Sequence, residues 1–206
     1  MKKIIALALA LILTLTCFAA CGAKASDTDL AAVKANKKII VGITEYAPMD
    51  FKDENGEWTG CDAEFAQLFA KELGVECEFY VIADWGKKFM ELDTKQIDAV
   101  WNGMTITEEA KLNSSVSNPY VVNAQVVVMK ADVVADYDYM ESLNSLTIAV
   151  ENGSAGQDAA NTITGATVVP LQDQGAALLE VKAGTADACV IDITMAYAMT
   201  GEGTDY

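Results

Sequence analysis

The residue types best suited to ligand chemistry are concentrated at residues 98–107, which read DAVWNGMTIT. The segment begins as a short apolar strand and breaks at Asn102 and Gly103. Such a break frees backbone N–H and C=O groups just past a strand's carboxyl end, where open α/β sheets bind ligands. Thr105 and Thr107 add hydroxyl groups, and Thr107 is a candidate N-cap for a helix that starts with two glutamates. A buried strand ending in an Asn-Gly turn is also ordinary structure, so the flanking segments decide the interpretation.

The composition argues against several classes of function. The chain has 206 residues, enough for one large domain or two small ones. It carries 30 acidic and 14 basic residues and no histidine, and every basic residue is a lysine. So acidic a surface argues against binding nucleic acid. Without histidine or arginine the chain lacks the commonest general base and every bidentate fork for carboxylates, so we expect a non-enzyme with no cofactor and no metal.

The first residues have the features of an export signal. Two lysines precede an apolar run over residues 4–15, which is too short to span a membrane comfortably. Small residues then lead to Cys21, which resembles the lipobox of bacterial lipoproteins, with Phe18 where that motif usually has leucine. The resemblance implies a signal peptide over residues 1–20, lipidation of Cys21, and a tether over residues 21–36. It places the protein on the outer, extracellular or periplasmic, face of the cell membrane. The alternative is an uncleaved membrane anchor.

Three further cysteines give little information. Cys61, Cys77 and Cys189 include no pair with metal-ligand spacing. Cys77 and Cys189 lie in strand-like runs, where a small buried apolar side chain is the expected role. The sequence does not decide whether Cys61 and Cys77 form a disulfide.

The first half of the chain predicts a β-α-β-α-β order. Strands are expected at residues 38–43, 76–81 and 99–101, and a hairpin turn at residues 53–57. Asp62 is expected to cap a helix that stops at Gly74, and a short helix is expected over residues 87–94. The expected buried faces of the two helices consist of large apolar side chains: Phe65, Leu68, Phe69 and Leu73 in the first, and Phe89 and Leu92 in the second.

A long extended stretch at residues 121–129 then suits a crossing between two lobes, although one more strand of the same sheet would also fit. The α/β order restarts, with strands expected at residues 146–150, 167–170 and 187–191. We therefore expect lobe 1 at residues 37–123, a hinge strand at residues 124–130 and lobe 2 at residues 131–206. Two α/β units joined in this way imply a cleft between them.

In this order the segments resemble the bacterial extracellular solute-binding proteins of family 3, the receptors of polar amino-acid ABC importers. The resemblance rests on GITEYAP at 42–48, GCDAEF at 60–65, IDA at 97–99, WNGMTIT at 101–107, SNPY at 117–120, GS at 153–154 and GTADA at 184–188 leading to Asp192. It implies a two-lobed α/β fold of the periplasmic-binding-protein type II. It also implies a monomer that binds a polar amino acid or similar small zwitterion and delivers it to membrane permease subunits.

The resemblance also implies roles for single residues. Tyr46 and Trp85 would wall the ligand, although Trp85 could instead cap the first lobe. The segment Asn102, Gly103, Met104 and Thr105 would hold the ligand's α-ammonium group. Asp192 would bind the same cation, with a helix N-cap as its alternative role. Backbone N–H groups at Ser154 and Ala155 would receive the ligand's carboxylate.

Two departures from the family stand out. The family usually places an arginine for the ligand's carboxylate where this chain has Ala110, and Lys111, one residue along, is the candidate replacement. Family members also continue beyond the segment at residues 195–199, so we expect the fold to be incomplete at the C-terminus, as in a fragment. A naturally shortened protein is the second explanation.

Two other functions fit the same fold. One is a ligand-sensing domain without a transport role. The other is a dehydratase-like enzyme, for which Glu45, Asp50 or Asp192 could supply an acid or base in the cleft.

Overall fold

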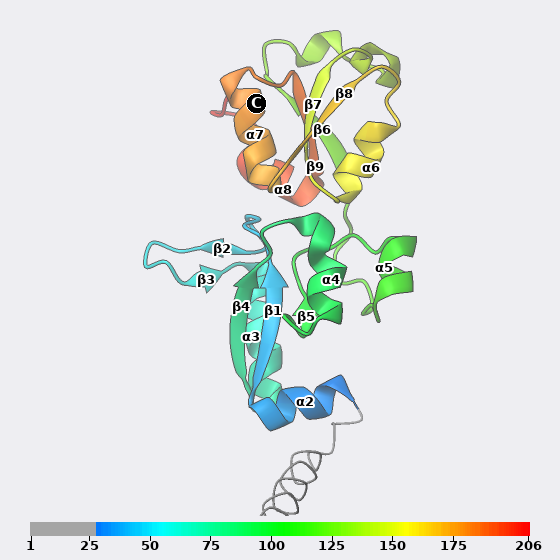
Figure 1. The fold of residues 1–206 in the computed structure, drawn as a ribbon. Coiled ribbons are helices and arrows are strands. Elements are labelled where there is room, and N and C mark those ends of the chain that lie inside the picture. Colours follow the sequence, from blue (N-terminus) through cyan, green and yellow to red (C-terminus); the bar gives the residue numbers. More distant parts are fainter. Residues whose placement is uncertain (1–27) are drawn as a thin grey trace, which may run out of the picture.

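The structure is a computed structural model, and it describes residues 28–206. The expected signal peptide, Cys21 and the first part of the tether, up to residue 27, lie outside the described residues. No helix within residues 28–206 has the length and apolar character to cross a membrane. Figure 1 shows two lobes, each built on its own sheet with helices packed around it.

The first lobe has a parallel sheet of three strands in the order β4-β1-β5. Its central strand β1 (Lys38–Ile43) pairs with β4 (Glu76–Val81) on one side and with the short β5 (Ala99–Val100) on the other. The β-branched run at residues 38–43 predicts this central position, and Val41 and Ile43 are fully buried. The expected strand at residues 38–43 is therefore confirmed. The short helix α4 (Lys88–Asp93), after the 3-10 turn η1 (Trp85–Lys87), delivers the chain to β5.

The buried face of α3 (Cys61–Leu73) is not the one the sequence predicts. Phe65, Leu68 and Phe69 are 45%, 59% and 42% exposed, while the alanines Ala63 and Ala66 are buried. Small side chains let the helix backbone approach the sheet closely, and the two phenylalanines pack edge-on against Trp101 beside the sheet. Gly60, and not Asp62, is the N-cap residue, whereas the predicted stop at Gly74 is confirmed by its left-handed backbone.

Two smaller elements complete this lobe. The strands β2 (Phe51–Lys52) and β3 (Trp58–Thr59) form a hairpin, whose predicted turn is held by Asp53 accepting from the backbone of Asn55 and Glu57. Residues 29–36, expected as part of the tether, form the helix α2 (Asp29–Asn36) instead. Val33 on this helix is buried against the first lobe's core, so the sequence's small polar character was misleading there.

The second lobe has a four-stranded sheet in the order β6-β9-β7-β8. The strands β7 (Thr147–Glu151), β8 (Thr167–Leu171) and β9 (Ala188–Asp192) are parallel, and β6 (Gln125–Met129) runs antiparallel at the edge. The 3-10 turns η2 (Val134–Asp136) and η3 (Met140–Leu143) connect β6 to β7. Helices α7 (Gln174–Ala183) and α8 (Ile193–Met199) cover one face of the sheet, and α6 (Ala155–Asn161) covers the other.

The connection between the lobes differs from the predicted hinge strand. The extended stretch expected from residue 121 becomes a strand only at Gln125, and it pairs continuously with β9 as far as Met129. The strand expected as a hinge at residues 124–130 is thus an edge strand of the second lobe. The crossing itself lies just before it, after α5 (Glu108–Asn113), in a segment without helix or strand. Figure 1 shows this segment passing from the lower lobe to the upper one.

Candidate ligand-binding site

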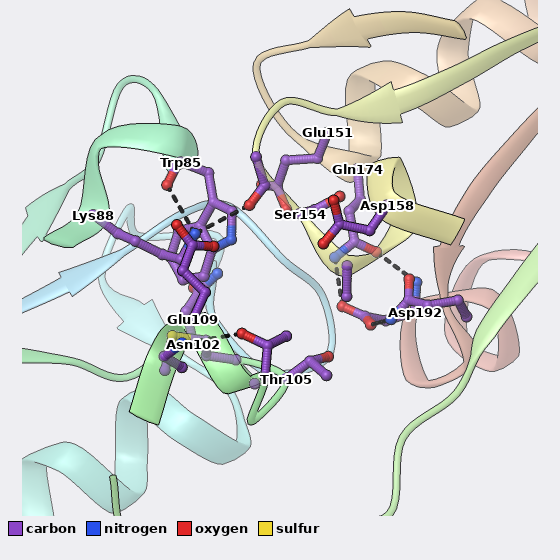
Figure 2. A pocket seen from close by; sticks show the side chains of 17 residues that line it. Trp85, Lys88, Asn102, Thr105, Glu109, Glu151, Ser154, Asp158, Gln174 and Asp192 are labelled. Atoms are coloured by element: carbon purple, nitrogen blue, oxygen red, sulfur yellow. Dashed lines mark hydrogen bonds between the residues drawn. The ribbon is translucent and has the colours of Figure 1, made fainter. Parts of the chain in front are cut away.

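The candidate site is the cleft between the two lobes, where the carboxyl ends of β5, β7 and β9 meet. This is the edge at which open α/β sheets bind ligands. Figure 2 shows the side chains that line it. The lining residues come from both lobes: Trp85, Lys88, Asn102, Gly103, Met104, Thr105, Thr107, Glu109, Ala110, Gln125, Glu151, Gly153, Ser154, Ala155, Asp158, Gln174 and Asp192.

The loop after β5 is held rigidly from behind. The Asn102 side chain is buried and accepts from the backbone N–H of Thr44 at 2.8 Å, while its amide donates to the Thr44 hydroxyl at 2.7 Å. Gly103 has φ +60, and a Cβ there would lie 2.7 Å from the Tyr46 ring. Its N–H donates to Asp62 on α3. Because the Asn102 side chain is hydrogen-bonded to Thr44, just after β1, the main chain of this loop is the part that can bind a ligand.

Asp192 ends β9 and is held by three side-chain amides. One carboxylate oxygen accepts from Asn123 and from Gln125 at 2.6 Å, and the other accepts from Gln174 at 2.6 Å. Asp192 stands at the N-cap position of α8, but its side chain makes no capping hydrogen bond. The amides fix the carboxylate at the cleft wall, which is the placement needed for a charge-assisted bond to a cation.

Lys88 is a lining residue that the sequence did not predict. Its side chain is 6% exposed, and its ammonium donates to the backbone carbonyl of Gly153 in the other lobe at 3.0 Å and to that of Trp85 at 3.4 Å. The ammonium also lies 5.0 Å from the Trp85 ring centroid and 4.9 Å from that of Phe89. Burial lowers the pKa of Lys88 below its ordinary value. Phe89 and Leu92, the predicted buried residues of this helix, are only half-buried.

Glu151 is a second unpredicted group. It ends β7, is 3% exposed, and accepts from the Thr44 hydroxyl at 3.5 Å. Burial, reinforced by the charge of Asp192, raises the pKa of Glu151 to about 8. The carboxyl is therefore mostly protonated at neutral pH, and it can donate a hydrogen bond as well as accept one. The strand expected at residues 146–150 runs one residue further, because β7 includes Glu151.

The lobes touch at one mouth of the cleft. Gly153 has φ +70, and a Cβ there would lie 2.4 Å from the Gly86 Cα of the first lobe. Beside it, the Asn152 amide donates to Asp84 at 2.8 Å. Ser154 caps α6 by accepting from the Gln157 N–H at 3.1 Å, which leaves its O–H as a donor. This mouth therefore tolerates no side chain at residue 153.

The structure brings most of the predicted binding residues together. Eight of them line the cleft: Trp85, Asn102, Gly103, Met104, Thr105, Ser154, Ala155 and Asp192. It does not bring Tyr46 or Lys111 there. Tyr46 is 2% exposed and lies behind Gly103, because the glycine leaves room for its ring. Lys111 pairs with Glu108 at 2.6 Å on the exposed side of α5, while Ala110 faces the cleft.

The cleft also lacks the features of a metal site. No group of three or more histidine, cysteine, aspartate or glutamate side chains in the described part of the chain is arranged to hold a metal ion. Cys61, Cys77 and Cys189 are all free thiols, so the disulfide left open between Cys61 and Cys77 is not formed. What the cleft offers is one ammonium, four carboxyl groups and the main chain of two glycine-containing loops.

Comparison with known proteins gives consistent relatives. The chain is 31% identical over 222 residues to the ABC transporter glutamine-binding protein GlnH of Bacillus subtilis, covering 100% of this chain and 80% of that protein. It is 28% identical to the L-cystine-binding protein TcyJ of Escherichia coli K12, covering 78% of this chain and 60% of that relative's length. A crystal structure of the ancestral amino acid-binding protein AncCDT-1, a precursor of cyclohexadienyl dehydratase, matches with TM-score 0.79 and 34% identity, covering 83% of this chain and 77% of that one.

The two-lobed α/β architecture is thus that of the amino-acid-binding periplasmic proteins, the expected type II fold. The family model described as bacterial extracellular solute-binding proteins, family 3, matches residues 39–180, from the central strand of the first lobe to the last turns of α7. A solute-binding role follows from this match together with the interlobe cleft. The chain belongs to the bacterial extracellular solute-binding proteins of family 3.

Proposed function

We propose that this protein is the substrate-binding component of an ABC importer, which binds a polar amino acid or similar small zwitterion in the interlobe cleft and delivers it to permease subunits. The observation that carries the proposal is the pairing of opposite charges across the cleft. Asp192 of the second lobe offers a carboxylate fixed by three amides, and Lys88 of the first lobe offers a buried ammonium. The relatives named above support it, because their names specify glutamine, cystine or an amino acid.

No covalent chemistry is needed for this function. A ligand that contacts both lobes favours the closed arrangement, because it makes more contacts there than in the open one. A permease can then distinguish the closed, loaded form from the open form. We place lobe 1 before residue 114, the connecting segment at residues 114–124, and lobe 2 from residue 125 onward, where β6 begins. We further propose a monomer, lipidated at Cys21 and held at the outer face of the membrane.

The test measures the binding of each of the twenty common L-amino acids to the purified protein, by thermal shift and by calorimetry. We expect saturable stabilisation by one or a few polar amino acids, because a ligand selective for the folded state raises its stability. The variant Asp192→Asn should weaken that binding by about 10- to 100-fold, since it removes a charge-assisted hydrogen bond. Asp138→Asn, at an exposed position that does not line the cleft, is the matched control. No stabilisation by any of the twenty would contradict the proposal.

A second candidate is a dehydratase-like enzyme. It is favoured by Glu151, a buried carboxyl group at the cleft whose raised pKa suits a general acid. The named relationship of AncCDT-1 to cyclohexadienyl dehydratase shows that this fold can precede an enzyme. Asp50, one of the acids the sequence suggested, is fully buried and does not line the cleft. Dehydration of a cyclohexadienyl acid by the purified protein, lost in Glu151→Gln, would favour the enzyme over the transporter component.

A further inference from the structure

Lys88 is a buried cation with an incomplete set of partners. An ammonium has three N–H donors, and the two backbone carbonyls that Lys88 contacts account for two of them. Within the described part of the chain, Lys88 forms no ion pair, although its side chain lines the cleft. A buried charge without an opposite charge is unfavourable, so an anion placed against the third donor would stabilise it. Figure 2 shows the side chain between Trp85 and the loop that carries Ser154.

No other lysine of the described residues can bind a carboxylate at this position in the cleft. Lys88 is the sole lysine among the residues that line the cleft in the described part of the chain. Its neighbour Lys87 pairs with Asp84 at 3.1 Å, and Lys111 pairs with Glu108 outside the cleft. A carboxylate that enters the cleft therefore meets one ammonium. The position of the Lys88 ammonium is set by α4 and by the second lobe together, because Lys88 lies on α4 and donates to Gly153.

The surrounding acids determine what else the ligand must carry. Glu109 and Asp158 line the same cleft, and their charges favour the charged form of Lys88, opposing its desolvation. Neither lies within ion-pair distance of Lys88, so neither uses its remaining donor. These acids would repel a simple carboxylate anion. The arrangement accepts a carboxylate when the same molecule also brings a cation for the acids, as an amino acid does.

We propose that Lys88 binds the α-carboxylate of the ligand, at a position different from the Ala110 site where an arginine was expected. The inference rests on the proposed function, because it takes the ligand to be an amino acid. Asp192 then receives the α-ammonium group from the second lobe, and Lys88 receives the carboxylate while keeping its bond to Gly153. Ligand binding and the contact between the lobes share one side chain.

The experiment compares each of the twenty L-amino acids with its α-carboxamide, which keeps the side chain and the ammonium but lacks the carboxylate charge. The affinities are measured by calorimetry for the wild type, Lys88→Met and Lys111→Met. Wild type should prefer the free acid by about 10-fold or more. Lys88→Met keeps an apolar stem of similar length, and it should bind the acid about 10- to 100-fold more weakly and lose the preference for acid over amide. Lys111→Met should change neither quantity.

The ratio of acid to amide affinity separates a ligand contact from a structural effect, because a loss of interlobe packing would weaken both ligands equally. If Lys88→Met fails to fold, Lys88→Gln, which retains an N–H donor without the charge, is judged by the same ratio. A variant that binds more weakly but keeps the wild-type ratio overturns the role of Lys88 and leaves the proposed function standing. A wild type that binds none of the twenty overturns both.

Discussion

Glu151 illustrates how one residue can couple this fold to pH. The carboxyl is enclosed by the second lobe and by Thr44, with Asp192 and Lys88 as its charged neighbours at the cleft and Asp173 beyond them. Its folded pKa of about 8 lies above the ordinary value of 4.5. Folding therefore favours the protonated form. The stability that this contributes is fully present below the ordinary pKa and is lost as pH rises through the folded pKa.

We expect the free energy of unfolding to fall between pH 5 and pH 9, and Glu151→Gln to remove much of that fall. The shift from 4.5 to about 8 corresponds to about 5 kcal/mol of stability that is lost by the alkaline end of this range. Burial also raises the pKa of Asp50 to about 8, so Asp50 should account for the pH dependence of stability that remains in Glu151→Gln. Denaturant unfolding at several pH values measures the effect, with the exposed Glu141→Gln as control. An unchanged slope in Glu151→Gln would mean that this carboxyl does not control the pH dependence.

At the scale of elements, periodic runs and turn residues were sufficient to place most strands. The strand at residues 38–43, the hairpin turn at residues 53–57 and the helix stop at Gly74 depend on local chemistry, and the structure has them where the sequence predicts. Tertiary contacts decided the rest. The alanine face of α3 is buried because closeness to the sheet outweighed the larger apolar area of its phenylalanines.

The candidate site divides in the same way. Asp192 and the loop after β5 follow from their position at strand ends, so the sequence can find them. Lys88 could not be found in this manner, because a lysine in a short helix is usually solvated, whereas here tertiary contacts with Gly153 of the second lobe and with two aromatic rings bury it. Lys111 was the nearer candidate in sequence, but one step along α5 turns it away from the cleft toward Glu108.

The contact between η1 and the turn before α6 gives an element-scale prediction. Gly153→Ala should disfavour the closed arrangement, because the added Cβ meets the Gly86 backbone and the residue has a positive φ. Gly56→Ala is a matched control, since Gly56 has φ +82 but no atom within 4 Å of an added Cβ. Both variants should lose about 1 kcal/mol from backbone strain. Gly153→Ala alone should also weaken ligand binding by 10-fold or more, measured by calorimetry. If Gly153→Ala and Gly56→Ala bind the ligand with equal affinity, this contact has no role in closure.

At the scale of the whole molecule, the two lobes are joined by a few polar contacts across the cleft. Lys88 meets Gly153, Asp84 meets Asn152, and the Tyr46 hydroxyl meets that of Thr194. Such contacts are modest individually, so a ligand that adds bonds to both lobes can shift the balance between open and closed forms. Three of the apolar cores lie within a single lobe, while a fourth also packs Tyr46 and Met49 of the first lobe against the core of the second.

The proposed anchoring also belongs to this scale. Cys21→Ser should move the protein from the membrane fraction to the soluble extracellular or periplasmic fraction, because the thiol is the proposed site of lipid attachment. Cys61→Ser, which changes an exposed thiol in the first lobe, should leave the distribution unchanged. Fractionation of expressing cells followed by immunoblotting measures both. Membrane retention of Cys21→Ser would instead favour the uncleaved anchor.

The position of Trp85 has a spectroscopic consequence. Of the chain's 3 tryptophans, Trp58 lies in the hairpin strand β3, Trp101 packs against α3, and Trp85 lines the cleft beneath an ammonium. Indole emission depends on nearby charge and water, and both should change at Trp85 when the proposed zwitterion enters the cleft. The candidate site therefore contains an intrinsic fluorophore, and titrating the emission should follow occupancy without any attached dye. In Trp85→Phe the ligand-dependent part of that signal should vanish while the emission of the other two indoles persists.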